Sequence, residues 1–392
     1  MILRGTRVVD FSHVLAGPHC GRQLADIGAE VIKVENIAQG DSVRHIGTGT
    51  ALAGTVFANQ NAGKLALAVD LTHPAGRQVA LDLVHASDVV LENFRPGVMR
   101  RFGLDYVSLH HQHRRLVMCS ISAFGQTGPM AEQPGFAYSA MAMSGALDLD
   151  RDPDGRPHIG HLPVADFLAA INAVAAIGFA LLHRDRTGDG QYLDISLLDC
   201  MLAAEDLATP GVINGGSYTP QRRPGVSVHR VGDGCVVLMV TTSDMFCRFA
   251  DAIGAPDLKA DPRFVSRDDR IANQGQLDAI ADQWIAAFPT RRAVTDFLTS
   301  HRVPCAAILS VQEATAQAQV RARGSLCDVA GADHALGRVV RSGMRFSLTP
   351  SSPQGPAPSQ VGSHTNDILR RVLGYSTQQI GALVTEKVVH QA

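Results

Sequence analysis

The chain has 392 residues, with 35 Lys and Arg against 37 Asp and Glu and a formal net charge of −2. At roughly 150 residues per domain this length predicts two domains with real hydrophobic cores, and 45% hydrophobic with 18% charged residues excludes a disordered or fibrous chain. The even charge gives no general attraction to nucleic acid or to an anionic membrane, and 5% aromatic residues offer few surfaces on which bases could stack.

The first 125 residues alternate short β-branched runs with helical patterns, which predicts parallel β-α-β units. Candidate helices lie at about Pro18–Ile27 and Pro74–Ala86. The predicted strands are Val8–Phe11, Val31–Glu35, Val89–Phe94 and Leu116–Ser122. We therefore expect an α/β fold with a Rossmann-like, doubly wound parallel sheet, in which ligands lie beyond the carboxyl ends of the strands.

The middle of the chain predicts a Gly- and Met-rich helix near Phe136–Leu147, a long apolar helix at Pro163–Leu182 and a strand at Tyr192–Leu197. The apolar helix approaches the length of about 20 residues that spans a bilayer. It contains Asp166 and Asn172 and is rich in Ala. Because a carboxylate in the hydrocarbon costs about 2.5–3.5 kcal/mol on insertion scales, we interpret the segment as a core helix and expect no membrane partner.

The pattern breaks at Pro210–Gly225, where the density of Gly and Pro is typical of a linker or loop. Beyond it the pattern restarts as a smaller α/β domain. The expected elements are strands at Cys235–Val240 and Val303–Leu309 and helices around Asp244–Ile253, Leu277–Phe288 and Arg291–Ser300. A second Pro-rich connector, Pro350–Ser359, precedes a terminal helical segment.

The cysteines and the N-terminal sequence bear on cellular location. The seven cysteines are scattered, odd in number and never in a C-x-x-C pair, which predicts neither a disulfide framework nor a zinc site. The first residues contain no uninterrupted apolar stretch of the kind found in signal peptides. We therefore expect a cytoplasmic protein.

Common cofactor and nucleophile motifs are missing from the sequence. The turn after the first strand, Ser12–Pro18, lacks G-x-G-x-x-G, which disfavours NAD, and no P-loop sequence occurs. The histidines at 110, 111 and 113 are flanked by arginines and lack a carboxylate partner, so a solvated helix face is favoured over a metal site. The hydrolase motif G-x-S-x-G is absent. We expect neither NAD nor a metal.

Asp166, at the start of the long apolar helix, has two interpretations. An Asp near a helix N-terminus commonly caps it and stabilises it by about 1 kcal/mol. The same position favours an ionised carboxylate, and small apolar neighbours would keep water away, so the group could act as a nucleophile. Position along the chain leaves both interpretations open.

Several short sequence segments along the chain bear on the role of Asp166. They are Val8–Pro18 (VVDFSHVLAGP), Gly28–Glu35 (GAEVIKVE), Leu91–Arg101 (LENFRPGVMRR), Ser120–Pro129 (SISAFGQTGP), Val164–Phe167 (VADF), Arg186–Asp199 (RTGDGQYLDISLLD) and Gly362–Leu369 (GSHTNDIL). In this order they resemble the class III CoA-transferase (CaiB/BaiF) family, which includes formyl-CoA transferases and α-methylacyl-CoA racemases.

The resemblance implies a function and a set of site residues. Asp166 matches the catalytic Asp, which would move CoA from an acyl-CoA to a small carboxylic acid through an anhydride and an aspartyl-CoA thioester. The implied CoA-binding residues are Val14, Leu15, Lys64, Val69, Thr72, Asn93, Phe94, Arg95 and Arg101. The implied acyl-substrate residues are Phe136, Tyr138, Gly215 and Gly216, the last two as shields or backbone donors.

Several positions depart from the family pattern. Asn36 and Thr72 stand where relatives often carry basic residues, so other cations, Arg44 and Lys64 among them, would meet the CoA phosphates. Phe136 stands where the racemases have a His, and a phenyl ring cannot carry the proton that racemisation moves. CoA transfer is therefore favoured, with a 2-methylacyl-CoA racemase and a non-catalytic CoA-binding protein as alternatives.

The resemblance also implies domain organisation and assembly. We predict a large domain formed by residues 1–224 and completed by residues 331–392, with a small α/β domain at residues 225–330 inserted between them. Members of the family form interlocked homodimers, in which each chain threads through the ring of the other. We expect the same assembly here.

Overall fold

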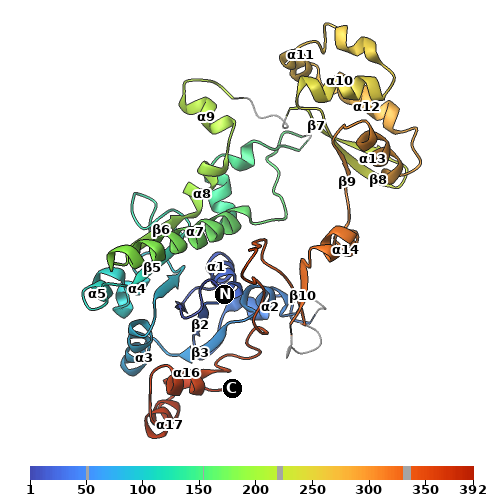
Figure 1. Ribbon diagram of the computed structural model, residues 1–392. Coiled ribbons are helices and arrows are strands. Elements are labelled where there is room, and N and C mark those ends of the chain that lie inside the picture. Colours follow the sequence, from blue (N-terminus) through green and yellow to red (C-terminus); the bar gives the residue numbers. More distant parts are fainter. Residues whose placement is uncertain (50–52, 153, 219–223, 330–336) are drawn as a thin grey trace. The chain divides into compact units, whose positions relative to one another are not determined.

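The computed structural model describes residues 1–49, 53–152, 154–218, 224–329 and 337–392 (Figure 1). By its internal contacts the chain divides into a larger unit, formed by Met1–Leu147, Ile159–Tyr218 and Gln319–Ala392, and a smaller unit, formed by Asp148–His158 and Thr219–Ala318. The larger unit is therefore discontinuous in sequence, and the smaller one is inserted in it.

The division by internal contacts differs from the expected domain boundaries in three places among the described residues. Residues 148–158 and Pro224 belong to the smaller unit, and residues 319–329 belong to the larger one. The second assignment has a local cause, because β10 (Leu326–Asp328) pairs with β11 (Arg338–Val340), and the Val340 N–H donates to Asn59 Oδ1 at 3.0 Å. The boundary that we predicted at residues 330 and 331 lies outside the described residues.

A seven-stranded sheet forms the centre of the larger unit, in the order β12-β3-β2-β1-β4-β5-β6. Its strands are β1 (Arg7–Asp10), β2 (Glu30–Glu35), β3 (Leu65–Val69), β4 (Val89–Glu92), β5 (Val117–Ser122), β6 (Tyr192–Ser196) and β12 (Val389–His390). All neighbours are parallel except β12, which is antiparallel to β3. The predicted α/β fold with a parallel sheet is confirmed. The strand order reverses between β1 and β4, which places the topological switch point there.

Helices cover both faces of this sheet (Figure 1). The helices of the larger unit are α1 (Ala16–Asp26), α2 (Thr55–Asn61), α3 (Pro74–His85), α4 (Val98–Phe102), α5 (Tyr106–His110), α6 (Ala137–Met143), α7 (Val164–Thr187), α8 (Leu197–Ala204), α9 (Ala208–Ile213), α15 (Ala318–Ala322), α16 (Thr365–Arg371) and α17 (Thr377–Thr385), of which α9 and α15 do not pack on the sheet. The inner strands β4 and β5 are buried along their whole length, as is typical of a parallel sheet with both faces covered.

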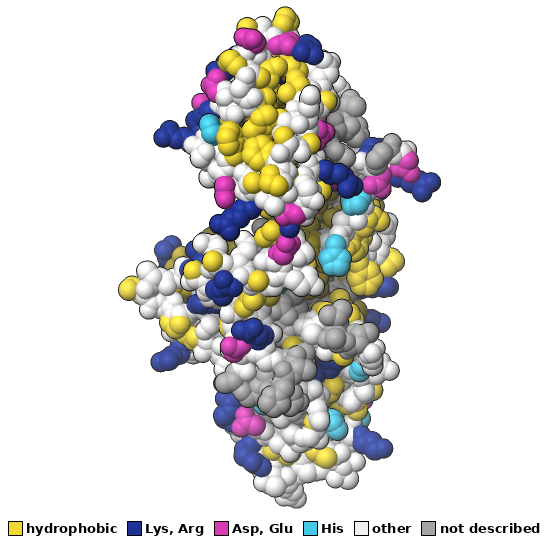
Figure 2. Space-filling model, turned by 90° about the vertical axis from the view of Figure 1, so that its right-hand side faces the viewer, with side chains coloured by type: hydrophobic (Ala, Val, Ile, Leu, Met, Phe, Trp, Pro, Cys, Tyr) yellow, Lys and Arg dark blue, Asp and Glu magenta, His cyan; other side chains and the backbone are white. Residues whose placement is uncertain are grey.

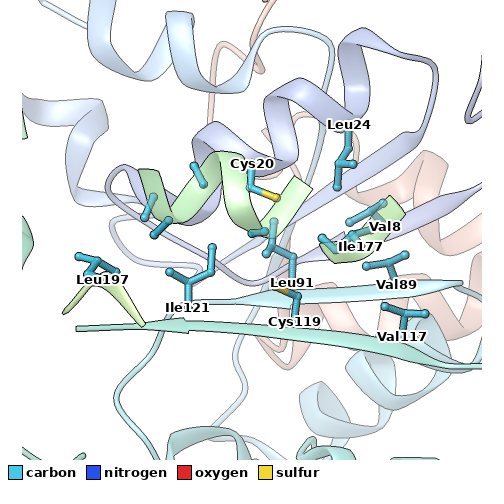
Figure 3. Close-up of a cluster of buried hydrophobic side chains, with 14 of the residues drawn as sticks. Val8, Cys20, Leu24, Val89, Leu91, Val117, Cys119, Ile121, Ile177 and Leu197 are labelled. Carbon is cyan, nitrogen blue, oxygen red and sulfur yellow. The ribbon is translucent and has the colours of Figure 1, made fainter. Parts of the chain in front are cut away.

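One hydrophobic cluster joins α1 and α7 to the sheet (Figure 3). Cys20 and Leu24 of α1 and Ile177 of α7 face Leu91 of β4 and Cys119 of β5. Small residues on α7, among them Ala169 and Ala173, are fully buried and allow this close packing. A second cluster on the other face packs α3, α16 and α17 against the same strands. The helices α1 and α7 thus pack against each other on one face of the sheet.

The helix α7 is long and apolar enough to cross a membrane by length and composition, and it is the one such helix among the described residues. Part of it is buried against α1, β5 and α8. The opposite face exposes large apolar side chains, including Ile171, Phe179 and Leu182. The predicted core helix therefore has one buried face and one face that no described residue covers.

The smaller unit has its own core around a three-stranded antiparallel sheet. Its elements are β7 (Val226–Val231), β8 (Gly234–Met239), β9 (Cys305–Ala307), α10 (Ser243–Ala252), α11 (Arg267–Ala272), α12 (Gln274–Ile285), α13 (Arg291–Ser300) and α14 (Val311–Ala316). On the molecular face shown in Figure 2, basic and acidic side chains are interspersed, in keeping with the near-even composition.

Candidate active site

The turn from β1 into α1 lies at the switch point of the sheet. It contains His13, Val14 and Leu15, and α1 begins at Ala16. Val14 has a φ of 69°, which a β-branched residue rarely adopts. The N–H groups of Leu15 and Ala16 have no hydrogen-bond partner within the described part of the chain, as expected for the first turn of a helix. This turn forms a wall shared by two cavities.

The first cavity has a volume of about 80 Å³ and contains Asp166. Its lining brings together His13, Val14, Leu15, Ala16, Asn93, Ile121, Ser122, Ala123, Gly135, Phe136, Asp166 and Leu197. Five of the residues predicted for the site therefore meet here, although the chain separates them by up to 152 positions. Gly135 permits the approach of Phe136, because a Cβ at residue 135 would lie 2.7 Å from Ala123 Cβ.

Asp166 is the third residue of α7 and is half-buried. It does not cap the helix: the N-cap position is Pro163, and no side-chain capping bond is present. Within the described residues its carboxylate has no hydrogen-bond or ion-pair partner. Burial raises the pKa of the Asp166 carboxyl from 3.8 to about 6, because desolvation disfavours the charged form. Asp166 is therefore not the cap of α7, and its role as a nucleophile stays a prediction.

The second cavity, of about 510 Å³, lies at the carboxyl ends of β1, β2, β3 and β4. Val69 and Thr72 line it beside β3, and Phe94 lines it beside β4. Asn36 also lines it. Thr72 Oγ1 donates to Asp70 Oδ1 at 2.6 Å, so its hydroxyl is held by its own turn.

His13 joins the two cavities, because it lines both of them. Its ring packs against Phe94, with the ring centroids 5.2 Å apart. Desolvation is the main cause that lowers the pKa of His13, so the imidazole is neutral at pH 7. The sequence analysis missed this residue. Its position between VVDFS and VLAGP was available as a signal, since it lies inside the first matching phrase.

Lys64 is not available to a phosphate in this structure. Its ammonium is fully buried and forms an ion pair with Asp10 Oδ2 at 2.8 Å, and it donates to the Pro18 carbonyl at 2.9 Å. Arg44 is similarly engaged, with two bonds to the Glu35 carboxylate at 2.6 and 2.8 Å. Both cations hold the fold around the cavities, and both also line a further cavity of about 740 Å³. Their expected role as phosphate ligands stays a prediction.

The other predicted residues lie outside the two linings. Arg95 and Arg101 are exposed, and each is next in sequence to a residue that lines the second cavity. Tyr138 donates to the carbonyl oxygens of Gly160 and His161 at 3.3 and 3.0 Å.

The N–H groups of Gly215 and Gly216, just after the end of α9, donate to the carbonyl oxygens of Val212 and Gly211 in its last turn, both at 3.0 Å. They are therefore not free to stabilise an oxyanion. Among the described residues no group of three or more His, Cys, Asp or Glu is arranged to hold a metal ion.

Comparison with known proteins identifies the class. The model of the family described as CoA-transferase family III matches residues 3–365. The chain belongs to this family, which confirms the resemblance read from the sequence, and it is a family III CoA-transferase.

Individual relatives are similar over the whole chain. The chain is 34% identical over 385 residues to the succinate–glutarate CoA-transferase of Agrobacterium fabrum, and the match covers 94% of each protein. It is 30% identical over 398 residues to the beta subunit of the succinyl-CoA–L-malate CoA-transferase of Chloroflexus aurantiacus, covering 99% of this chain and 98% of that one. A solved CaiB/BaiF family protein from Brucella suis is 31% identical, with a TM-score of 0.82, over 94% of this chain and 99% of that one.

Proposed function

We propose that the protein transfers CoA from an acyl-CoA to a carboxylic acid through Asp166. The Asp166 carboxylate attacks the thioester carbonyl, the C–S bond breaks, and CoA leaves as a thiolate. The thiolate attacks the Asp166 carbonyl of the mixed anhydride, which forms an aspartyl-CoA thioester and releases the donor acid. An acceptor carboxylate attacks this thioester and expels the thiolate, which then takes the acceptor acyl group and frees Asp166. Protons and electrons balance at every step.

One observation carries this proposal: the partnerless Asp166 carboxylate lies in a cavity with four residues expected to contact CoA or the acyl group. A carboxylate bonded to Arg or Lys would be a poor nucleophile, whereas a desolvated one without a partner is reactive. Its pKa of about 6 leaves it ionised at pH 7. The site therefore combines a charged nucleophile with limited water.

The two cavities suggest how CoA binds. The nucleotide occupies the larger cavity between Val69 and Phe94, and the thioester reaches Asp166 past His13. The first-turn N–H groups of α1 at Leu15 and Ala16 donate to the oxyanion of the tetrahedral intermediates. A preorganised donor of this kind contributes about 3–4 kcal/mol to catalysis, and this role replaces the one expected of the Gly215 and Gly216 pair.

The substrates that we propose are small dicarboxylic acids and their CoA esters. The named relatives act on succinate, glutarate and L-malate or their CoA esters. The Gly- and Met-rich segment near Phe136–Leu147 offers Met141, Met143 and Phe136 as candidates for an apolar acyl pocket. Of these, Phe136 lines the Asp166 cavity, whereas Met141 packs in the hydrophobic core and Met143 is exposed outside the lining. The apolar character of the site thus rests on fewer residues than expected.

The mechanism is tested by trapping the acyl-enzyme. We expect hydroxylamine to convert Asp166 to a hydroxamate only after addition of succinyl-CoA, detected by peptide mass spectrometry, and Asp166→Asn to abolish both labelling and transfer. Asp199→Asn is the matched control, because Asp199 is the third residue of α8 as Asp166 is of α7, but is exposed. Transfer by Asp166→Asn at the wild-type rate would rule out the covalent route.

A second activity has one supporting observation. His13 lines the same cavity as Asp166, and an imidazole with a carboxylate could exchange the α-proton of a 2-methylacyl-CoA. Phe136 occupies the position where the racemases have their His, so we favour transfer. Incorporation of solvent deuterium at the α-carbon, in the absence of an acceptor acid, would reverse this preference.

Assembly and location are part of the proposal. The uncovered apolar face of α7, with Ile171 and Phe179, fits an interface with a second copy of the chain, as in the interlocked dimer expected from the family. The cysteines within the described residues are free, which fits a reducing cytoplasm.

A further inference from the structure

The strained turn between β1 and α1 is held by side chains from other strands. A left-handed φ at Val14 is unfavourable for a β-branched residue and persists only where the surroundings impose it. The Val14 N–H donates to Asp41 Oδ1 at 3.1 Å. Asp41 follows β2 and is therefore distant from Val14 in sequence. The restraint comes from the tertiary structure and not from the turn itself.

Asp41 is fixed in turn by buried charges. Its carboxylate pairs with Lys33 at 2.9 Å, and both side chains are at most 1% exposed. The same ammonium donates to the Ser12 carbonyl at 2.7 Å, and the Asp41 N–H donates to Glu35 Oε1 at 2.9 Å. Lys33 and Asp41 therefore restrain the backbone on both sides of His13, at the Ser12 carbonyl and the Val14 N–H.

Asn93, at the end of β4, holds the residue between them. Its Oδ1 accepts from the His13 N–H at 2.9 Å, and its Nδ2 donates to the His13 carbonyl at 2.8 Å. The Asn93 amide is thus paired with the protein backbone on both of its polar atoms. This arrangement differs from the CoA contact that the sequence analysis expected of Asn93.

The residues that these hydrogen bonds restrain also line the proposed substrate site. His13 lines both cavities, and Val14 and Leu15 line the Asp166 cavity. We propose that Asp41 and Asn93 are positioning residues that hold residues 12–14 as a fixed partition between the nucleotide cavity and the Asp166 cavity. The partition sets where the thioester meets the carboxylate. This inference rests on the proposed function of Asp166.

A double-mutant cycle with Val14→Gly tests the partition. Glycine adopts a positive φ at little steric cost, so the turn needs less restraint in that background. We expect Asp41→Ala to slow acylation of Asp166 by about tenfold in the wild-type background and by less than about threefold in the Val14→Gly background, a coupling within the range for contacting residues. Asp41→Asn keeps an acceptor for the Val14 N–H and should retain more of the rate than Asp41→Ala.

Two further variants separate positioning from stability. Asp26→Ala removes the acid of another buried ion pair, with Arg22 at 2.7 Å, at the far end of α1, and should lower the melting temperature without slowing acylation. Asn93→Ala leaves no buried charge unpaired and serves in the same cycle if Asp41→Ala does not fold. Equal slowing in both backgrounds, or loss of stability alone, would overturn the positioning role.

The experiments distinguish failure of the covalent Asp166 mechanism from failure of the positioning role of Asp41 and Asn93. Absence of Asp166 labelling in the wild-type enzyme would refute the covalent route, and the cycle is then scored on steady-state CoA transfer. Additive effects in an enzyme that does label Asp166 would refute only the partition.

Discussion

Replacement of Asp166 by Asn should remove activity and stabilise the fold at the same time. The structure buries this carboxyl without a partner and raises its pKa from 3.8 to about 6. Because the folded state prefers the protonated form, the cost of Asp166 is absent below pH 3.8 and grows until the pH exceeds 6. Asn cannot ionise, so Asp166→Asn escapes this cost.

The magnitude follows from the shift. A difference of about two pH units at 1.36 kcal/mol each sets an upper limit of about 3 kcal/mol, and partial exposure of the side chain lowers the expectation to about 1–2 kcal/mol. Urea unfolding of the wild type, Asp166→Asn and Asp199→Asn at pH 4 and pH 8 measures it. The advantage of Asp166→Asn should be small at pH 4 and fully developed at pH 8, while Asp199→Asn shows no such trend.

A stability difference independent of pH would refute this reasoning, because only an ionisation that differs between folded and unfolded states produces the trend. A loss of stability at pH 8 would show instead that Asp166 is held by favourable contacts. In that case the carboxylate would not be the desolvated nucleophile on which the mechanism depends.

Three other outcomes are expected. The rate of Asp166 acylation should fall as the pH drops through about 6, measured as kcat/KM against pH; a flat profile down to pH 4.5 would contradict the raised pKa. Lys64→Met should lower the free energy of unfolding by about 3–5 kcal/mol, because it leaves Asp10 buried and unpaired; a change in KM without loss of stability would restore Lys64 as a phosphate ligand. Phe179→Glu, on the exposed face of α7, should shift the protein toward monomers in sedimentation velocity, and an unchanged sedimentation coefficient would place the interface elsewhere.

The strands of the sheet show what local sequence could and could not predict. The runs VVDF and VIKVE are β-branched and bounded by turn residues, and both became strands of the sheet. Residues Leu65–Val69 (LALAV) were missed, because Leu and Ala have no strand preference and the segment is a strand through its pairing with β2 and β12. Val389–His390 was missed for a related reason: two residues acquire strand geometry from a partner about 320 positions away.

The candidate site likewise contains residues that the local sequence identifies and residues whose role depends on tertiary contacts. Residues within matching phrases, such as Asp166, Val14 and Phe94, line the two cavities. The ion pair of Lys64 was not predictable from the local sequence, because it depends on Asp10 approaching from a different strand. The role of Asn93 likewise depends on a backbone segment that is 80 positions away. A motif identifies which residues are present, whereas burial decides which of their polar atoms remain free.

The near-even charge of the chain has a consequence for how it meets CoA. The larger cavity is lined by Glu35, Asp41 and Asp70, and its one lysine among the described residues, Lys33, is paired with Asp41. Lys33 neutralises Asp41, and Arg44, which lies outside this lining, neutralises Glu35. Asp70 adds a further negative charge, so the lining itself offers the phosphates no net attraction. Arg95 and Arg101, which are exposed and follow Phe94 in sequence, stay our predicted phosphate ligands. Buried charge in this protein therefore shapes the cavity, and the attraction for the phosphates is expected from exposed arginines.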